Sequence, residues 1–153
     1  MQRIAIFPGS FDPITTGHVD IINRALPIFD KIIISVGSNS EKQYFFSLEK
    51  RIQWIKKVFI KTPKIEVKSY NKLTVEFAKE SNARFLIRGL RNTSDFEFEK
   101  TVAHANSELN PSIESVFLLT QPKYSFITST LVREIIRNNG DYQKFVPNQV
   151  VID

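Results

Sequence analysis

The sequence of 153 residues contains no cysteine, which excludes a disulfide framework, a thiolate nucleophile and a zinc site with cysteine ligands. Histidine is scarce too, because His18 and His104 are the only two and lie too far apart for a local two-histidine metal motif. No apolar run approaches the length that spans a membrane, and no signal peptide pattern opens the chain. We therefore expect no protein-made metal site, no membrane contact and a cytoplasmic location.

The composition is that of an ordinary globular protein, with 42% hydrophobic and 24% charged residues. This length suffices for one domain, 1–153, with a real core. The formal net charge of +5 is weak support for anionic partners. Much of the positive charge lies in residues 50–57, and a charged run of this kind is typical of a solvated helix face. The 13 phenylalanines lie largely in predicted strands and apolar helix faces. They indicate a core, and we expect no nucleic-acid partner.

Apolar strand patterns alternate with amphipathic helix patterns along the chain. Short apolar runs predict five strands, at 4–7, 32–36, 65–67, 85–87 and 116–119. Helical periods separate them at 17–29, 48–60, 73–81 and 96–109, and a further helix is predicted to begin near Ser129. Alternating β and α units are typical of a parallel sheet covered on both faces. We therefore predict an α/β fold, a Rossmann-like doubly wound parallel five-stranded sheet with helices on both faces.

The segment from Phe7 to His18 joins the first predicted strand to the first predicted helix. It reads Phe-Pro-Gly-Ser-Phe-Asp-Pro-Ile-Thr-Thr-Gly-His. Such a loop exposes backbone N–H groups, and the helix N-terminus adds a partial positive charge. His18 falls in the first helical turn, within reach of the same anion. An ordinary surface turn is the alternative, because Gly and Pro also form turns. The combination of residues favours a phosphate site.

Two further segments follow predicted strands, and ligands bind at the carboxyl ends of strands in this class of fold. The fourth strand ends in Arg88-Gly89-Leu90-Arg91. Arginine suits bidentate contact with phosphate, and glycine lets a ligand approach the backbone. The alternative is a pair of surface arginines bound to nearby acids at 95, 97 and 99. After the fifth strand, the hydroxyl cluster in 125–133 enters a helix and can donate to phosphate, although Ser and Thr also cap helices.

Other charged residues give weaker signals. Lys42 lies in the longest irregular stretch, 38–46, where a lysine is most often simply solvated. Asp95 and Glu99 are one helical turn apart. They are expected to orient the arginine at 88 or at 91, or to bind a ligand hydroxyl, rather than to act as an acid pair. His104 lies mid-helix beside alanines, which favours a role in packing or subunit contact over catalysis.

With these segments, the chain resembles the nucleotidyltransferase superfamily. Members carry a T/H-x-G-H motif, matched by Thr15–His18, and an I-S-S-T-x-x-R motif, matched by Ile127–Arg133. Four more segments are similar to bacterial phosphopantetheine adenylyltransferases. These read Pro-Gly-Ser-Phe-Asp-Pro, Ile-Arg-Gly-Leu-Arg, Asp-Phe-Glu-Phe-Glu and Glu-Ser-Val-Phe-Leu. The resemblance covers nearly the whole chain with colinear spacing. Two mild departures are Ser10, where threonine is common, and Thr128, which replaces a serine.

The resemblance implies transfer of the adenylyl group of ATP to 4′-phosphopantetheine, which yields dephospho-coenzyme A and pyrophosphate. It implies that His18 stabilises the transition state and that Lys42 and Arg91 assist catalysis. The implied acceptor site is Ser10, Lys42, Thr74 and Arg88. The implied ATP site is Ser10, Phe11, His18, Gly89, Leu90, Arg91, Glu99, Tyr124, Ser125, Phe126, Ile127, Thr128, Ser129 and Thr130. Mg²⁺ is expected on the ATP phosphates. A homohexamer and feedback by coenzyme A are expected from the family.

Three other interpretations stay open at this point. Another adenylyltransferase or cytidylyltransferase of the superfamily would share the Gly-His and Ser-Thr segments and differ in its acceptor pocket. A fragment of a class I aminoacyl-tRNA synthetase also has a Gly-His helix start, but 153 residues leave no room for an anticodon-reading domain. A nucleotide-binding regulatory module would have no need for a transition-state histidine.

Overall fold

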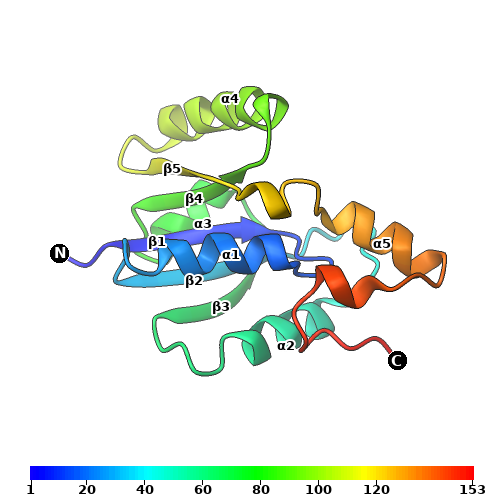
Figure 1. The fold of residues 1–153 in the computed structure, drawn as a ribbon. Coiled ribbons are helices and arrows are strands. Elements are labelled where there is room, and N and C mark those ends of the chain that lie inside the picture. Colours follow the sequence, from blue (N-terminus) through cyan, green and yellow to red (C-terminus); the bar gives the residue numbers. More distant parts are fainter.

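Five parallel strands form one sheet in the order β3-β2-β1-β4-β5. The structure is a computed structural model that describes residues 1–153, and Figure 1 shows the arrangement. The strands are β1 (Ile4–Gly9), β2 (Lys31–Gly37), β3 (Ile65–Tyr70), β4 (Phe85–Leu90) and β5 (Glu114–Leu119). The helices are α1 (Thr16–Ala25), α2 (Leu48–Val58), α3 (Thr74–Glu80), α4 (Thr93–Leu109) and α5 (Ser129–Arg137), with 3₁₀ turns η1 (Pro122–Tyr124) and η2 (Tyr142–Phe145).

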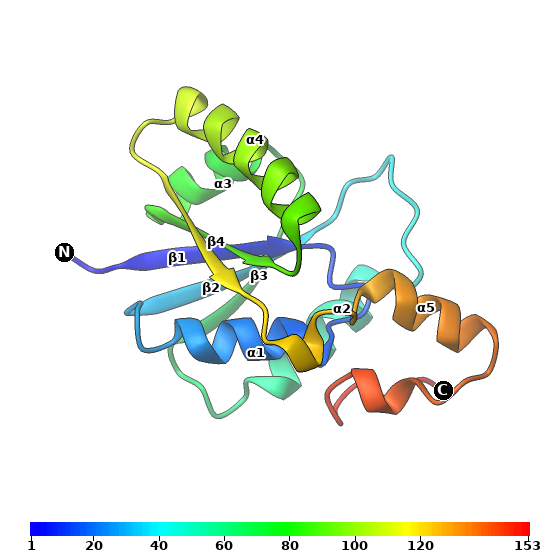
Figure 2. The same cartoon turned by 45° about the horizontal axis from the view of Figure 1, so that its top comes forward.

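Helices cover both faces of the sheet, which confirms the predicted fold class. The larger core cluster joins one face of β1 and β2 to α1, α2 and α5 through apolar side chains such as Ile34, Ile22, Ile55 and Val132. The smaller cluster joins Ile6 and other residues of the opposite face to α3. Figure 2 shows α3 and α4 on one side of the strands and α1 on the other. Burial of alternate strand residues on opposite faces fixes the register of the sheet.

The strands β1 and β4 separate toward their carboxyl ends. β1 pairs with β2 along its whole length, from Ile4 to Gly9. Its register with β4 covers only Ala5 and Ile6. The strand order also reverses direction at β1, because the chain continues to β2 and β3 on one side and to β4 and β5 on the other. Ligands of doubly wound sheets bind at such a switch point.

The C-terminal segment folds back onto the first core cluster. Val146 and Val150 are 3% and 2% exposed, and both belong to that cluster. The hydroxyl of Thr16, at the start of α1, donates to the carbonyl of Phe145 at 3.2 Å. The segment thereby fixes the first turn of the helix that carries His18.

Several element ends differ from the sequence predictions. α1 ends at Ala25 rather than at 29, because Pro27 has no N–H to continue the helical hydrogen bonds. α4 begins at Thr93 rather than at 96, since the side chain of Asn92 caps it by accepting from the N–H of Asp95 at 2.8 Å. β1 and β3 run two and three residues further than the apolar pattern indicated. No helix is both long enough and apolar enough to cross a membrane.

Candidate active site

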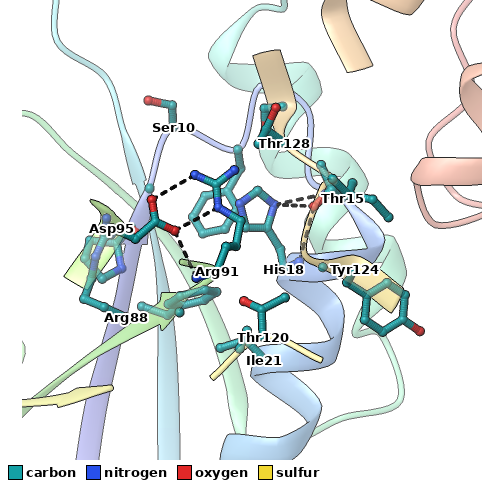
Figure 3. A pocket seen from close by; sticks show the side chains of 18 of the residues that line it. Ser10, Thr15, His18, Ile21, Arg88, Arg91, Asp95, Thr120, Tyr124 and Thr128 are labelled. Carbon is teal, nitrogen blue, oxygen red and sulfur yellow. Dashed lines mark hydrogen bonds and ion pairs between the residues drawn. The ribbon is translucent and has the colours of Figure 1, made fainter. Parts of the chain in front are cut away.

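A cavity of about 310 Å³ opens where β1 and β4 separate. Its lining comes from the β1–α1 loop, the first turns of α1, the end of β4, the start of α4 and the segment before α5. Figure 3 shows His18, Arg88, Arg91 and Asp95 gathered around it. The predicted site residues that line it are Ser10, Phe11, His18, Arg88, Gly89, Arg91, Glu99, Tyr124, Ile127, Thr128 and Ser129.

The ring of His18 is held by the cap of its own helix. The backbone N–H of Thr15 donates to Nδ1 at 3.0 Å, and the Thr15 hydroxyl accepts from the N–H of His18 at 3.3 Å (Figure 3). The ring also packs edge-on against Phe11, with centroids 5.0 Å apart. Because a backbone N–H can only donate, Nδ1 must be the acceptor, and the neutral ring carries its proton on Nε2. His18 is thus a fixed hydrogen-bond donor in the cavity.

The surroundings of His18 keep it neutral. Burial lowers its pKa most, and the positive charges of Arg88 and Arg91 act in the same direction, so that together they lower it from 6.5 to about 4. At pH 7 the neutral imidazole can donate one hydrogen bond through Nε2–H. It carries no second, readily released proton with which it could act as a general acid. The arrangement therefore suits stabilisation of an anion by hydrogen bonding rather than proton transfer.

Arg88 is held by an acid on α4. Its guanidinium donates to both carboxylate oxygens of Glu99, at 3.0 and 2.7 Å, and to the carbonyl of Pro8 at 2.7 Å. The Glu99 side chain is 10% exposed and that of Arg88 is 32% exposed. The bidentate contact fixes the plane of the guanidinium. The prediction that Glu99 orients an arginine is confirmed, and its carboxylate is engaged in that contact.

Arg91 has an equivalent partner in Asp95. Its guanidinium donates to the two carboxylate oxygens at 3.0 and 3.2 Å, and its backbone N–H also donates to Asp95 at 3.0 Å (Figure 3). This pair lies nearer the solvent, with side chains 34% and 22% exposed. Both arginines are therefore paired with acids, as the surface alternative predicted, but both also line the cavity.

A second helix N-terminus reaches the cavity from α5. Thr128 caps this helix by accepting from the N–H of Leu131 at 2.9 Å, and the hydroxyl of Ser129 donates to the carbonyl of Pro13 at 2.8 Å. Arg133 donates to the carbonyl of Asp12 at 2.8 Å. These bonds fasten α5 to the β1–α1 loop. Two helix N-termini thus lie at one cavity, which favours binding of an anion.

Lys42 and Thr74 line an adjoining cavity of about 650 Å³ between the 38–46 loop, α3 and α4. The two cavities share Pro8, Gly9, Ser10, Arg88 and Glu99 along their common edge. The ammonium group of Lys42 donates to the hydroxyl of Ser10 at 3.0 Å, so it points toward that edge. Aromatic and aliphatic groups of Tyr70, Leu73, Phe98 and Val102 line the far side.

Some predicted residues lie elsewhere. Thr130 lines a third hollow beside Lys42 and Arg133. Leu90 is buried. The Ser125 hydroxyl donates to the carbonyl of Pro122 at 2.8 Å, and the exposed ring of Phe126 packs against Phe145. None of these last three lines the cavities described here. His104 is exposed on α4 and lines neither cavity.

Sequence reasoning left out several residues that shape the site. Thr15 was part of the matched motif, and its role as a cap could have been read from its place before a helix. Thr120 lines the first cavity, but a lone threonine after a strand carries no signal. Asp12 and Arg51 are buried charged residues, 4% and 1% exposed, that join distant parts of the chain. Only the folded structure reveals those contacts.

The chain offers no cluster of three or more His, Cys, Asp or Glu side chains that could hold a metal ion. Asp95 and Glu99 are the carboxylates of the first cavity, and both are bound by arginine. A divalent cation at this site would therefore take most of its ligands from a bound substrate and from water, and Mg²⁺ usually binds phosphates in this way.

Comparison with known proteins agrees with this geometry. The family model described as cytidylyltransferase-like matches residues 6–135. A phosphopantetheine adenylyltransferase of Flavobacterium johnsoniae is 53% identical over 149 residues, 97% of each chain. That of Flavobacterium psychrophilum is 55% identical over 97% of this chain and 98% of its own. That of Nautilia profundicola is 47% identical over 100% of this chain and 99% of its own. The chain therefore belongs to the cytidylyltransferase-like family and, within it, to the phosphopantetheine adenylyltransferases.

Proposed function

We propose that this chain transfers the adenylyl group of ATP to 4′-phosphopantetheine, reversibly, to give dephospho-coenzyme A and pyrophosphate. The observation that carries the proposal is the convergence of His18, Arg88 and Arg91 at the split between β1 and β4, beside a second cavity that holds Lys42 and Thr74. The relatives are named phosphopantetheine adenylyltransferases, which supports a phosphorylated pantetheine as the acceptor and an adenylyl donor. A phosphate-binding cavity joined to a partly apolar one fits a nucleotide and a phosphorylated acceptor with an organic arm.

The chemistry requires little of the protein beyond alignment and neutralisation of charge. An oxygen of the acceptor phosphate attacks the α-phosphorus of ATP, and a new phosphorus–oxygen bond forms. The bond from the α-phosphorus to the oxygen shared with the β-phosphate breaks, and pyrophosphate leaves with that electron pair. A phosphate monoester is already anionic near neutral pH, so no strong general base is needed. This accounts for a cavity whose carboxylates are bound to arginines.

Each side chain has a role that follows from its position. His18 presents a neutral Nε2–H, which we expect to stabilise charge that develops on the α-phosphate. Lys42 and Arg88 flank the edge shared by the cavities and would hold the acceptor phosphate there, with Ser10 between them. Arg91 and the N-terminus of α5 line the first cavity, which would take ATP, and Thr74 lines the second, which would take the pantetheine arm. Mg²⁺ would bind through the ATP phosphates and neutralise part of their charge.

The assembly, location and regulation belong to the same proposal. Leu109 and Leu119 are exposed by 61% and 74%, on α4 and β5, and offer an apolar contact for further subunits. We propose a homohexamer, which light scattering would test, and a cytoplasmic location, where fractionation should find the chain. Coenzyme A contains the pantetheine arm and an adenylyl group, so it should compete for both cavities and inhibit.

The experiment is release of pyrophosphate from MgATP with and without 4′-phosphopantetheine. We expect release that depends on this acceptor and is lost in His18→Ala, while binding of MgATP is largely retained. His104→Ala is the matched control, because it removes the other histidine of the chain from an exposed position outside both cavities. Binding of ATP without turnover would contradict the proposal and favour a regulatory module. Release with a different phosphorylated acceptor would favour another member of the superfamily.

A further inference from the structure

The largest fully buried side chain is a charged one, Arg51 of α2, which is 1% exposed. Its guanidinium donates to three backbone carbonyls: Phe46 at 3.2 Å, Ser10 at 2.7 Å and Gly37 at 3.0 Å. It also lies over the ring of Tyr44, with 3.9 Å between Cζ and the ring centroid. Burial lowers the pKa of this guanidinium, and the charge of Asp12 opposes that effect. Burying such a group is costly unless its hydrogen bonds are made, and here several are.

The second buried charge, Asp12, contacts the same loop. One of its oxygens accepts from the N–H of Phe45 at 2.8 Å and the other from the N–H of Phe46 at 2.9 Å. Asp12 and Arg51 thus join three segments that are far apart in sequence. These are the loop after β1, the end of β2 and the last residues of the loop before α2.

The segment that these bonds enclose carries Lys42. This lysine is exposed, and its ammonium group contacts Ser10 at 3.0 Å and the Tyr44 ring at 5.6 Å. Arg51 binds the carbonyl of the same Ser10 and lies over the same Tyr44. Both neighbours that orient the lysine are therefore held by Arg51. Arg51 lines neither of the two cavities in which substrate is proposed to bind.

We propose that Arg51, supported by Asp12, is a positioning residue that fixes the 38–46 loop so that Lys42 reaches the edge shared by the two cavities. The inference rests on the proposed function, because it assigns Arg51 an effect on the same reaction. A long, flexible lysine on an irregular loop loses much of its side-chain entropy when it binds a phosphate. A loop fixed in advance lowers that cost, since the lysine is already directed at its target.

A purely structural role is the alternative, because a buried charge with three hydrogen bonds also contributes to stability. The two roles differ in one measurable respect. A positioning residue acts through Lys42, so its effect on catalysis should depend on whether Lys42 is present. A loss of stability alone should reduce catalysis by the same factor with or without Lys42.

The test is a double-mutant cycle of Arg51→Lys with Lys42→Met, scored by kcat/KM for 4′-phosphopantetheine. Arg51→Lys keeps the positive charge but replaces the planar guanidinium, whose separate N–H groups reach the three carbonyls, with a compact ammonium group of different geometry. We expect it to lower kcat/KM by about tenfold alone and by less than about twofold in the Lys42→Met background, a coupling within the range for residues in one network. Ile55→Val is the matched control, because Ile55 is a fully buried residue of the same helix that belongs to the core. Its effect should be equal in both backgrounds.

The outcomes separate this inference from the proposed function. Equal effects of Arg51→Lys in both backgrounds, as for the control, would overturn positioning while leaving the reaction intact. A wild-type chain without acceptor-dependent release of pyrophosphate would overturn both. If Arg51→Lys does not fold, Tyr44→Leu at a half-buried position replaces it in the cycle. It removes the ring that contacts both Arg51 and Lys42, and the absence of coupling in that cycle would equally overturn the inference.

Discussion

The protonation of His18 offers the most exacting test of the site. The structure gives this residue a pKa of about 4, against 6.5 for an ordinary histidine, because its ring is largely shielded from water and lies near two arginines. Between these two values the unfolded chain binds a proton at His18 and the folded chain does not. Stability must therefore fall as the pH drops from about 6.5 toward 4, and His18 contributes no further change below the lower value.

The size of the effect follows from the two pKa values. At about 1.4 kcal/mol for each pH unit, the interval between them sets a limit of roughly 3 kcal/mol. Between pH 7 and pH 5, this linkage lowers the free energy of unfolding by about 2 kcal/mol. His18→Gln keeps a hydrogen-bond acceptor near Thr15 but does not titrate. The wild type should therefore lose about 2 kcal/mol more than this variant over that range.

Urea unfolding of the wild type and of His18→Gln at pH 7 and pH 5 measures this difference in the free energy of unfolding. Contributions from groups that both proteins share, such as His104, cancel in the comparison. Nitrogen-15 NMR of the imidazoles should show the His18 proton on Nε2 at neutral pH. Addition of MgATP should raise the pKa of His18, because a nearby triphosphate stabilises the charged ring. A His18 that titrates near 6.5 in the free protein, or that carries its proton on Nδ1, would refute the reasoning.

Three further predictions concern the scaffold, and chemical unfolding measures all of them. Glu99→Gln should lower the free energy of unfolding by about 1–3 kcal/mol, because it breaks a largely buried ion pair with Arg88. The control, Glu97→Gln, removes an exposed ion pair and should change the free energy of unfolding by less than about 0.5 kcal/mol. Equal effects of the two substitutions would contradict the role of burial. Asn92→Ala should cost about 1 kcal/mol through loss of the α4 cap, and Asn92→Asp should restore most of it. Ile14→Ala, at a fully buried position, should cost about 2–5 kcal/mol, and a smaller loss would mean that the β1–α1 loop repacks.

The fold class could be predicted because its signals are local. Apolar runs mark the five strands, amphipathic periods mark the helices, and their alternation indicates a parallel sheet. The ends of elements were harder to predict, since they depend on single residues. Pro27 ends α1 early, and Asn92 starts α4 early. Both signals stand in the sequence, but the hydrophobic pattern on either side of them is stronger.

The candidate site could be predicted only in part. Arg88 and Arg91 follow the apolar run of the fourth strand, and that pattern placed them at the edge of the sheet where the first cavity opens. Their pairing with Asp95 and Glu99 was foreseen as an orienting role because the acids are close in sequence. The contacts of Arg51 with Ser10 and Gly37 join residues 41 and 14 positions apart, and no periodicity connects them. Burial of a charge is decided by the packing of distant segments, so the sequence pattern alone marked Arg51 as part of a solvated helix face.

The two cavities meet along one edge, formed by Pro8, Gly9, Ser10, Arg88 and Glu99. The side chains proposed to bind phosphate lie on α1, on β4 and in the loops after β1 and β2, whereas Leu73, Thr74 and Val102, in the second cavity, lie before α3 or on α3 and α4. Under the proposed function, substitutions of those three residues would reshape the acceptor pocket without moving the side chains that hold phosphate. The proposed function therefore separates the residues that select the acceptor from those that promote the reaction, so that a change of acceptor would not require a change of chemistry.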